Sequence, residues 1–185
     1  MAFNIKIENV VSSATLGVPI KLEKLVANLD GVEYEPEQFP GLVMRLKNPK
    51  SAALIFSSGK IVCTGAKSPK EAKIAISHVV TKLRKIGFKI PSNYKVTPEN
   101  IVASAMLDLK VNLNEIAFTL ENTEYEPNSF PGLVYRMVNP KVTFLIFGSS
   151  RIICTGAKTI TDVEIATEKL FKNLKKLQKK KPIEQ

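Results

Sequence analysis

The 185-residue sequence contains no tryptophan, one histidine and only two cysteines. Cys63 and Cys154 are too few for a disulfide scaffold, and the single His78 leaves a metal centre or a Ser-His-Asp triad with too few partners. No stretch approaches the roughly 20 apolar residues of a membrane span, and the first residues lack the layout of a signal peptide. We therefore expect an intracellular, non-enzymatic protein with no catalytic residue, no metal, no cofactor and no membrane contact.

Basic residues outnumber acidic ones by 27 to 17, which gives a formal net charge of +10. Such an excess draws a protein to polyanions, namely nucleic acid or an anionic membrane surface. Half of the excess falls in residues 166–185, which hold seven lysines and two glutamates. A basic tail over about 175–185 is therefore expected, and its charge is equally well explained by solubility alone.

The sequence repeats itself after 91 residues. Residues 33–67 and 124–158 are identical at 23 of 35 aligned positions, which chance does not produce. This duplication predicts two similar units, residues 1–92 and 93–182. Two copies are too few for a solenoid, so we expect a pseudo-two-fold pair whose target has approximate two-fold symmetry as well.

Each repeat has the pattern of a strand, a short helix, a four-strand meander and a long helix. Residues 3–11 alternate as a strand does, and apolar residues recur at helical spacing over 20–29. Ser68-Pro69 opens the long helix and Gly87 ends it. The predicted class is α+β, with ten antiparallel strands and four helices. The expected meander strands of the first repeat are 32–36, 41–47, 51–57 and 60–64.

One face of the predicted sheet has no evident cover. Neighbouring strand residues point to opposite faces, and both faces of Leu54-Ile55-Phe56 are apolar. Two helices per repeat cover one face, so the other exposes an apolar patch larger than monomers carry without a purpose. With Phe56, this second face is expected to include Asn9, Val11, Leu54, Val62 and Thr64, then Asn100, Val102, Leu145, Phe147, Ile153 and Thr155.

Cations border this second face. Lysine is depleted in protein–protein interfaces, whereas cations on phosphates beside neutral side chains on base edges suit a nucleic-acid groove. A major-groove reader would need Arg, Gln or Asp on the face itself. Their absence favours the minor groove. The bordering cations are Arg45, Lys60, Lys67, Arg136, Arg151 and Lys158.

These motifs resemble the TATA-box-binding protein family of general transcription initiation factors over about residues 3–177. Asn-x-Val, Phe-Pro-Gly-Leu-Val-x-Arg, Leu-Ile-Phe and Thr-Gly-Ala-Lys each occur twice. The short amino-terminal extension and the close similarity of the repeats are typical of archaeal members. The resemblance implies a saddle-shaped sheet with the four helices on its convex face. It implies that the concave face binds A·T-rich, TATA-like promoter DNA in the minor groove and bends it.

The resemblance also implies roles for single residues. Phe39, Phe56, Phe130 and Phe147 match the phenylalanines that wedge between base steps, and their spacing from Asn9 and Asn100 is 30 and 47 in both repeats. Asn9, Asn100, Thr64 and Thr155 match groups that bond base edges, and the six cations match phosphate contacts. The apolar floor is matched by Val11, Val102, Leu54, Leu145, Val62 and Ile153.

The same resemblance implies the partners transcription factor B, the RNA polymerase machinery and double-stranded promoter DNA. It implies a cytoplasmic, chromosome-associated location, or a nuclear one if the source is eukaryotic. In the family, an acidic loop of the second repeat docks transcription factor B. Here residues 126–129 retain Glu126 but have Asn128 and Ser129, while residues 35–38 of the first repeat are more acidic. The family match assigns the contact to Glu126, with the more acidic first loop as the alternative docking end.

An alternative function stays open at this stage. The chain could be an interaction scaffold that covers its apolar face with another protein or with a second copy of itself, as a homodimer when free. Asn9 and Asn100 could be edge or turn residues. Phe118 and Phe144 have no counterpart in the first repeat and are expected in the core, as are Cys63 and Cys154 on the helix-facing side.

Overall fold

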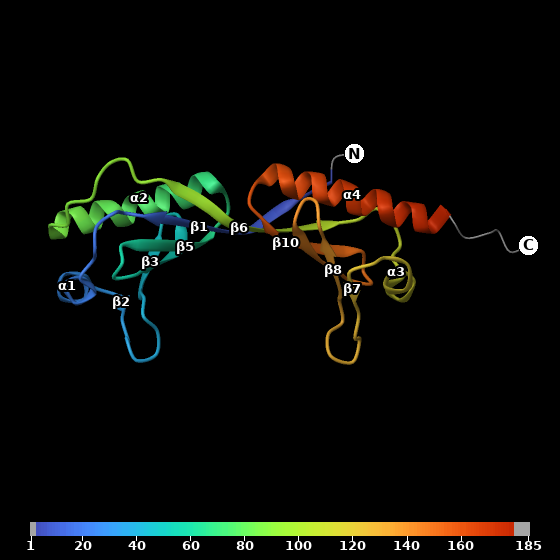
Figure 1. Cartoon of the computed structure of the whole chain (residues 1–185), viewed down its shortest axis with the longest axis horizontal. Helices are drawn as coiled ribbons and strands as arrows, with labels where there is room; N and C mark the ends of the chain where they lie inside the picture. The colour runs from blue at the N-terminus through green and yellow to red at the C-terminus, as the bar shows by residue number, and fades with distance from the viewer. Residues whose placement is uncertain (1–2, 180–185) are drawn as a thin grey trace, which may run out of the picture. The chain divides into compact units, whose positions relative to one another are not determined.

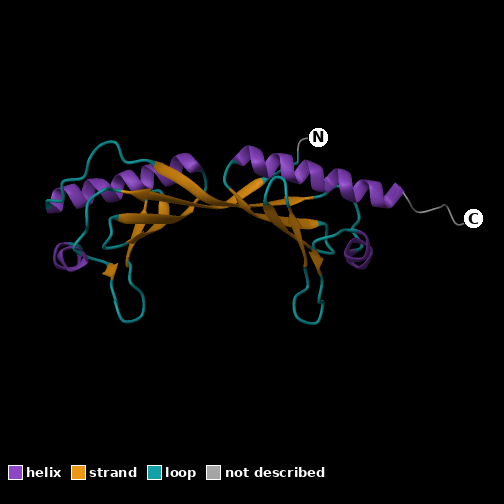
Figure 2. Ribbon diagram, viewed as in Figure 1, coloured by secondary structure: helices purple, strands orange, loops and turns teal. Residues whose placement is uncertain are grey.

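The computed structural model describes residues 3–179, and both repeats contain the expected elements in the expected order (Figures 1 and 2). The first repeat has β1 (Lys6–Thr15), α1 (Leu22–Asn28), β2 (Val32–Glu33), β3 (Leu42–Lys47), β4 (Lys50–Ile55), β5 (Lys60–Ala66) and α2 (Pro69–Ile86). The second has β6 (Val96–Met106), α3 (Leu113–Thr119), β7 (Thr123–Glu124), β8 (Leu133–Met137), β9 (Val142–Ile146), β10 (Arg151–Ala157) and α4 (Ile160–Lys179).

The strands form one ten-stranded sheet in the order β2-β3-β4-β5-β1-β6-β10-β9-β8-β7. Within each repeat, neighbouring strands pair antiparallel, for example β3 with β4 and β8 with β9. The predicted α+β class with ten antiparallel strands and four helices is confirmed. Two compact units share the chain: Asn9–Glu99 forms one, and the other combines residues up to Glu8 with those from Asn100 onward.

The long helix of the first repeat begins and ends as its sequence predicts. The Ser68 hydroxyl accepts a hydrogen bond from the Glu71 N–H, and Pro69 occupies the first turn, where it costs no intrahelical bond. Gly87 ends α2 with φ of 109°, a left-handed conformation that favours glycine. The chain thus leaves the helix sharply, and Phe88 follows immediately.

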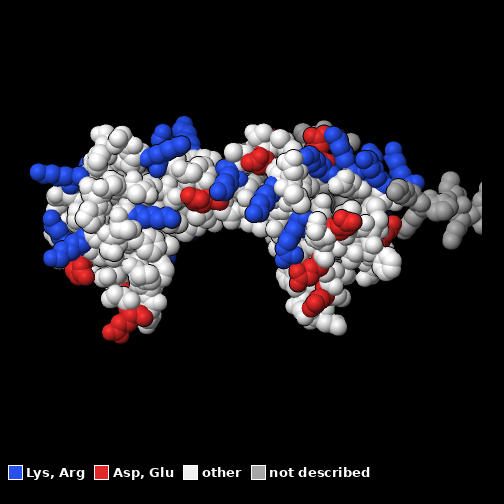
Figure 3. Space-filling view, in the orientation of Figure 1, with Lys and Arg blue, Asp and Glu red and all other residues white. Residues whose placement is uncertain are grey.

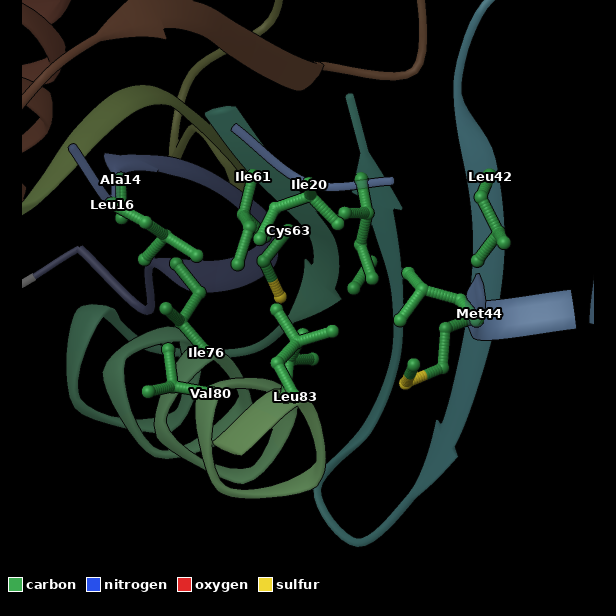
Figure 4. Close-up of a cluster of buried hydrophobic side chains, with 14 of the residues drawn as sticks. Ala14, Leu16, Ile20, Leu42, Met44, Ile61, Cys63, Ile76, Val80 and Leu83 are labelled. Atoms are coloured by element: carbon green, nitrogen blue, oxygen red, sulfur yellow. The ribbon is translucent and has the colours of Figure 1, made fainter. Parts of the chain in front are cut away.

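Within the Asn9–Glu99 unit, the helices cover one face of the strands. Ile61 and Cys63 of β5 point at Ile76 and Leu83 of α2, and all four side chains are fully buried (Figure 4). Alternate strand residues supply this core because successive side chains point to opposite faces. Burial of the two cysteines is confirmed, at 0% exposure for Cys63 and 2% for Cys154.

Two phenylalanines were expected in the core of the second unit, and the structure buries one of them. Phe144 of β9 is fully buried, as expected. Phe118 of α3 was expected in the core as well, and this is wrong, because its side chain is 98% exposed. The helix buries Leu113 and Ile116, and Phe118 lies on the side of α3 away from Ile116. A seven-residue helix has room for only one buried stripe.

The carboxyl-terminal region differs from the predicted tail in one respect. Residues 175–179 belong to α4, and residues 180–185 lie outside the described part of the chain. Over residues 3–179, none of the helices is long and apolar enough to cross a membrane.

Candidate nucleic-acid interface

The face of the sheet opposite the helices stays partly open in both units, and we call it the open face. On β4 and β5, Ile55 and Ile61 are fully buried under α2. Leu54, Val62 and Thr64 alternate with these buried positions and are only half-buried. The expected placement of these side chains on the face that the helices leave uncovered is therefore confirmed.

Strand register brings the residues of the open face into cross-strand rows. Leu54 pairs with Val62, and Leu145 pairs with Ile153. The rows also include four residues that the sequence reasoning missed. The signal lies in the alternation of side chains: two of the four are two residues before Leu54 or Leu145 on the same strand, and the other two pair with Leu54 or Leu145 across strands. They are Val43 and Ala52 in one unit and Val134 and Thr143 in the other.

Two phenylalanine pairs stand at equivalent positions of the two units. The ring centroids of Phe39 and Phe56 lie 5.8 Å apart at 70°, and those of Phe130 and Phe147 lie 5.9 Å apart at 69°. Such edge-to-face packing is the favoured geometry for aromatic pairs. Phe39 is 39% exposed and Phe130 40% exposed. Each pair therefore presents apolar ring surface to solvent.

A glycine makes each pair possible. A Cβ atom on Gly41 would lie 2.7 Å from Cε1 of Phe39 and 3.0 Å from Cε1 of Phe56. Gly132 has the same relation to the second pair, at 2.8 Å from Phe130 and 3.0 Å from Phe147. The Pro-Gly segment was interpreted from the sequence only as a turn. Its glycine in fact gives the two rings the space in which they pack.

Asn9 is held in one orientation by its neighbours on β5. Its Oδ1 accepts a hydrogen bond of 2.7 Å from the Gly65 N–H, and its Nδ2 donates to the Thr64 hydroxyl at 3.2 Å. Gly65 has φ of 94° next to a register shift between β1 and β5, and this bulge aims its N–H at Asn9. Asn9 is thus part of a polar cluster on a strand and not an edge or turn residue.

The second unit repeats this arrangement. The Asn100 Oδ1 accepts a hydrogen bond of 2.7 Å from the Gly156 N–H, and its Nδ2 donates to the Thr155 hydroxyl at 3.3 Å. An amide nitrogen carries two N–H groups, and the threonine accounts for one. The geometry therefore supplies a second N–H as a donor on the open face. The minor groove of A·T pairs offers acceptors only, so these donors match its chemistry.

Arg45 and Arg136, both predicted to bind phosphate, each form an ion pair with a glutamate of the neighbouring strand. Arg45 of β3 lies 3.5 Å from the Glu33 carboxylate, and Arg136 of β8 lies 3.2 Å from that of Glu124. Both pairs are largely exposed, so they contribute little to stability. A phosphate would have to compete with these carboxylates, which the sequence reasoning did not foresee.

The other cations lie at the ends of β5 and β10. Lys60 and Arg151 begin the two strands, Lys67 and Lys158 follow them, and all four side chains are exposed. In the first unit, Lys67 lines a hollow of about 710 Å³ together with Arg45 and Thr64. This hollow brings predicted phosphate and base-edge residues of one repeat to the same place.

Acidic residues lie at the loops between β2 and β3 and between β7 and β8, which project from the sheet (Figures 1 and 3). We call residues 35–38 and 126–129 the tip loops. In each loop a glutamate carbonyl closes the turn: the Glu35 carbonyl accepts from the Phe39 N–H, and the Glu126 carbonyl accepts from the Phe130 N–H. The backbone of each glutamate thus supports the first ring of its pair, while its carboxylate is exposed.

The buried thiols on the opposite side of the sheet are not suited to chemistry. Burial raises the pKa of the Cys154 thiol to about 12. Burial also raises the pKa of Cys63, and a hydrogen bond with Ser51 partly opposes this effect. Thiolates are the reactive form, so both cysteines are inert packing groups. Among the described residues, no cluster of three or more His, Cys, Asp or Glu could hold a metal ion.

Comparison with known proteins gives one consistent result. A sequence model for transcription factor TFIID, or TATA-binding protein, matches residues 4–86 and again residues 95–177. The TATA-box-binding protein of Methanobrevibacter smithii is 52% identical over 174 residues, covering 94% of this chain and 96% of its own length. That of Archaeoglobus fulgidus is 49% identical over 177 residues, with 95% and 97% covered. The solved structure of Methanococcus jannaschii TBP superposes with a TM-score of 0.87 at 49% identity, covering 93% of this chain and 98% of that one.

Proposed function

Because this chain belongs to the TATA-box-binding protein family, we propose that its open face binds A·T-rich promoter DNA through the minor groove. Members of this family are general transcription initiation factors that bind DNA, and they are not enzymes.

The observation that carries the proposal is the oriented amide of Asn9, with its counterpart Asn100. Each amide oxygen is occupied by a glycine N–H at 2.7 Å, so each amide offers N–H donors on the open face. Around them lie half-buried aliphatic side chains such as Val62 and Ile153. A guanine amino group is a donor and would meet other donors and apolar carbon here. Preference for A·T over G·C follows.

Wedging of apolar side chains between base steps is a known property of this family, and we propose it for the two phenylalanine pairs. Phe39 and Phe130 are the more exposed members, while Phe56 and Phe147 support them edge to face. Unstacking a base step costs a few kcal/mol, and ring surface exposed in the free protein offsets part of that cost when it is buried against bases.

A gel-shift titration tests the binding. We expect a TATA-like duplex to bind at least tenfold more tightly than a G·C-rich duplex of the same length. Equal affinity for both duplexes would mean that the protein binds DNA through its positive charge alone, without a preference for A·T pairs. Fluorescence transfer between the duplex ends tests wedging: Phe56→Ala and Phe147→Ala should reduce bending, while Phe118→Ala, an exposed ring on α3, should not. Equal bending by all four proteins would exclude a role for the pairs.

We further propose that a tip loop docks transcription factor B and thereby RNA polymerase. The exposed glutamates support this, because carboxylates at the loop tips repel phosphate and suit a basic protein partner (Figure 3). Following the family, Glu126 is assigned the contact. Glu126→Lys should then leave DNA binding unchanged or slightly stronger and weaken the ternary complex. If Glu35→Lys blocks that complex and Glu126→Lys does not, the docking end is the first loop.

Self-association through the open face is a second candidate, supported by its half-buried apolar rows. Such a homodimer would cover the open face when DNA is absent, and DNA would compete with the second copy for this face. Sizing at several protein and salt concentrations, with and without an A·T-rich duplex, tests this. A dimer that A·T-rich DNA does not dissociate would favour the scaffold function over the DNA-binding one.

A further inference from the structure

The second repeat has an apolar groove at a place where the first repeat packs a side chain of its own. The groove lies between α3, the end of α4 and the segment that precedes α3, and its volume is about 210 Å³. This is below the roughly 300–1,000 Å³ of small-molecule sites and suits a single side chain. Its apolar wall consists of Leu109, Val111, Ile116, Leu174 and Leu177.

Phe88 occupies the corresponding place in the first repeat. A shift of 91 residues maps Leu109–Val111 onto Val18–Ile20 and Glu115 onto Lys24. The Lys24 Nζ lies 5.0 Å from the Phe88 ring centroid. Phe88, Pro19 and Ile20 also border a hollow of about 350 Å³ that stays open beside the ring. The ring packs against the buried core of that unit.

The helix ends explain why the repeats differ. Gly87, in its left-handed conformation, ends α2 and turns the chain so that Phe88 packs back over the groove. The counterparts of these two residues are Gln178 and Lys179. They continue α4, and the Gln178 side chain donates a hydrogen bond to the Lys110 carbonyl. Among the residues 3–179, no aromatic side chain lines the second groove.

The positive charge around the groove favours an acidic partner. Lys110 is part of its lining, and the last two turns of α4 carry Lys175, Lys176 and Lys179 beside Leu174 and Leu177. Figure 3 shows basic side chains gathered over α4. Glu115 is the one acidic residue in the lining. Aromatic anchors in pockets dominate the energy of protein interfaces, and complementary charge sets the partner's identity.

We propose that this groove is a docking site for an acidic protein segment that inserts one aromatic side chain, in the way that Phe88 inserts into the first repeat. The site is separate from the open face, since α3, α4 and the segment before α3 form it. A regulatory or assembly partner can therefore bind here while the open face holds DNA.

An 11-residue peptide of Glu and Asp around one central Phe is the probe. Binding is followed by methyl NMR of Ile116, Leu174 and Leu177. We expect saturable shifts at these methyls, at least tenfold weaker binding when the peptide's Phe is Ala, and loss of binding when its acids are Lys. Equal binding of the Phe and Ala peptides overturns the proposal.

Two variants test the groove from opposite directions: one covers the groove of the second repeat, and the other uncovers its counterpart in the first. The double variant Gln178→Gly, Lys179→Phe gives the second repeat the Gly-Phe sequence that covers the groove in the first. It should abolish peptide binding, while DNA binding and the circular dichroism spectrum stay unchanged. Phe88→Ala should open a second site, with new shifts at Ile20 and Leu25. Peptide binding by this double variant at wild-type affinity contradicts the proposal. So does a chain ending at Lys179 that binds the peptide more than tenfold tighter, because the occupant would then be this chain's own terminal segment.

Discussion

Gly41 lies directly against the Phe39 ring, so closely that a Cβ atom there would stand 2.7 Å from Cε1 of the phenylalanine. Gly132 repeats the relation with Phe130 at 2.8 Å. Real Cβ atoms do not approach carbon so closely, so any larger residue must push the ring aside. The glycines are therefore part of the geometry of the two phenylalanine pairs.

Gly41→Ala should displace the Phe39–Phe56 pair and weaken binding to a TATA-like duplex by about tenfold, since about 1.4 kcal/mol corresponds to that factor. The fold should tolerate the change, because ring atoms at the end of a side chain can move. Gly148→Ala is the matched control: a Cβ there meets nothing within 4 Å, and the first repeat carries Ser57 at that position. An unchanged affinity for Gly41→Ala would show that the ring positions do not matter.

Asn9→Asp preserves the acceptor for the Gly65 N–H but replaces the amide donors with a carboxylate. We expect the stability to change little and DNA affinity to fall by roughly 10- to 100-fold, as for a lost base contact of about 1–3 kcal/mol. Asn28→Asp, an exposed change on α1, controls for the added charge. Isothermal titration with one A·T-rich duplex measures both. Equal losses for the two variants would point to charge alone.

The ion pair between Glu33 and Arg45 should hold that arginine back from phosphate. Glu33→Gln is expected to strengthen DNA binding severalfold, and Arg45→Gln should weaken it. The dependence of log affinity on log salt should also become shallower by about 0.9 for Arg45→Gln, the slope of one phosphate contact. If the salt slope is the same in the wild type and Arg45→Gln, Arg45 does not bind phosphate.

The two buried thiols predict a pH dependence of stability. Burial raises the pKa of Cys154 to about 12 in the folded protein, whereas the unfolded thiol ionises near its ordinary value of about 8.5. The folded state therefore retains a proton that the unfolded state loses. The free energy of unfolding should fall as the pH rises from about 9 toward 12.

Urea titrations across this pH range, with Cys154→Ala as the control, measure that effect. The alanine variant is less stable overall, but its stability should decline less between pH 9 and pH 11. Thiol labelling of the wild type at pH 8.5 should be slow without urea and rapid in it. Parallel declines in both proteins would assign the pH effect to other groups.

The sequence was sufficient for the architecture because the evidence for it is local and occurs twice. The Ser68-Pro69 start and the Gly87 end of α2 can be recognised from those residues alone, and the 91-residue repeat transfers them to the second half. The alternation of Leu54, Ile55 and Phe56 also predicted correctly which side chains the helices leave uncovered.

What the sequence did not reveal depends on side chains from different strands. The Arg45–Glu33 pair requires the register of β2 on β3, and the Gly41–Phe39 contact requires the ring positions. The lack of a counterpart in the first repeat does not imply burial, because Phe118 is 98% exposed. Its exposure follows from the short length and orientation of α3, which buries Ile116 instead.

Minor-groove readout by the open face is the central claim, and inosine substitution tests it most directly. An I·C pair lacks the guanine 2-amino group, so it resembles A·T in the minor groove and G·C in the major groove. We predict that a duplex in which every A·T pair of the TATA-like element is replaced by I·C binds within severalfold of the original, and at least tenfold more tightly than the G·C version. Binding of the I·C duplex as weak as that of the G·C duplex would contradict the account.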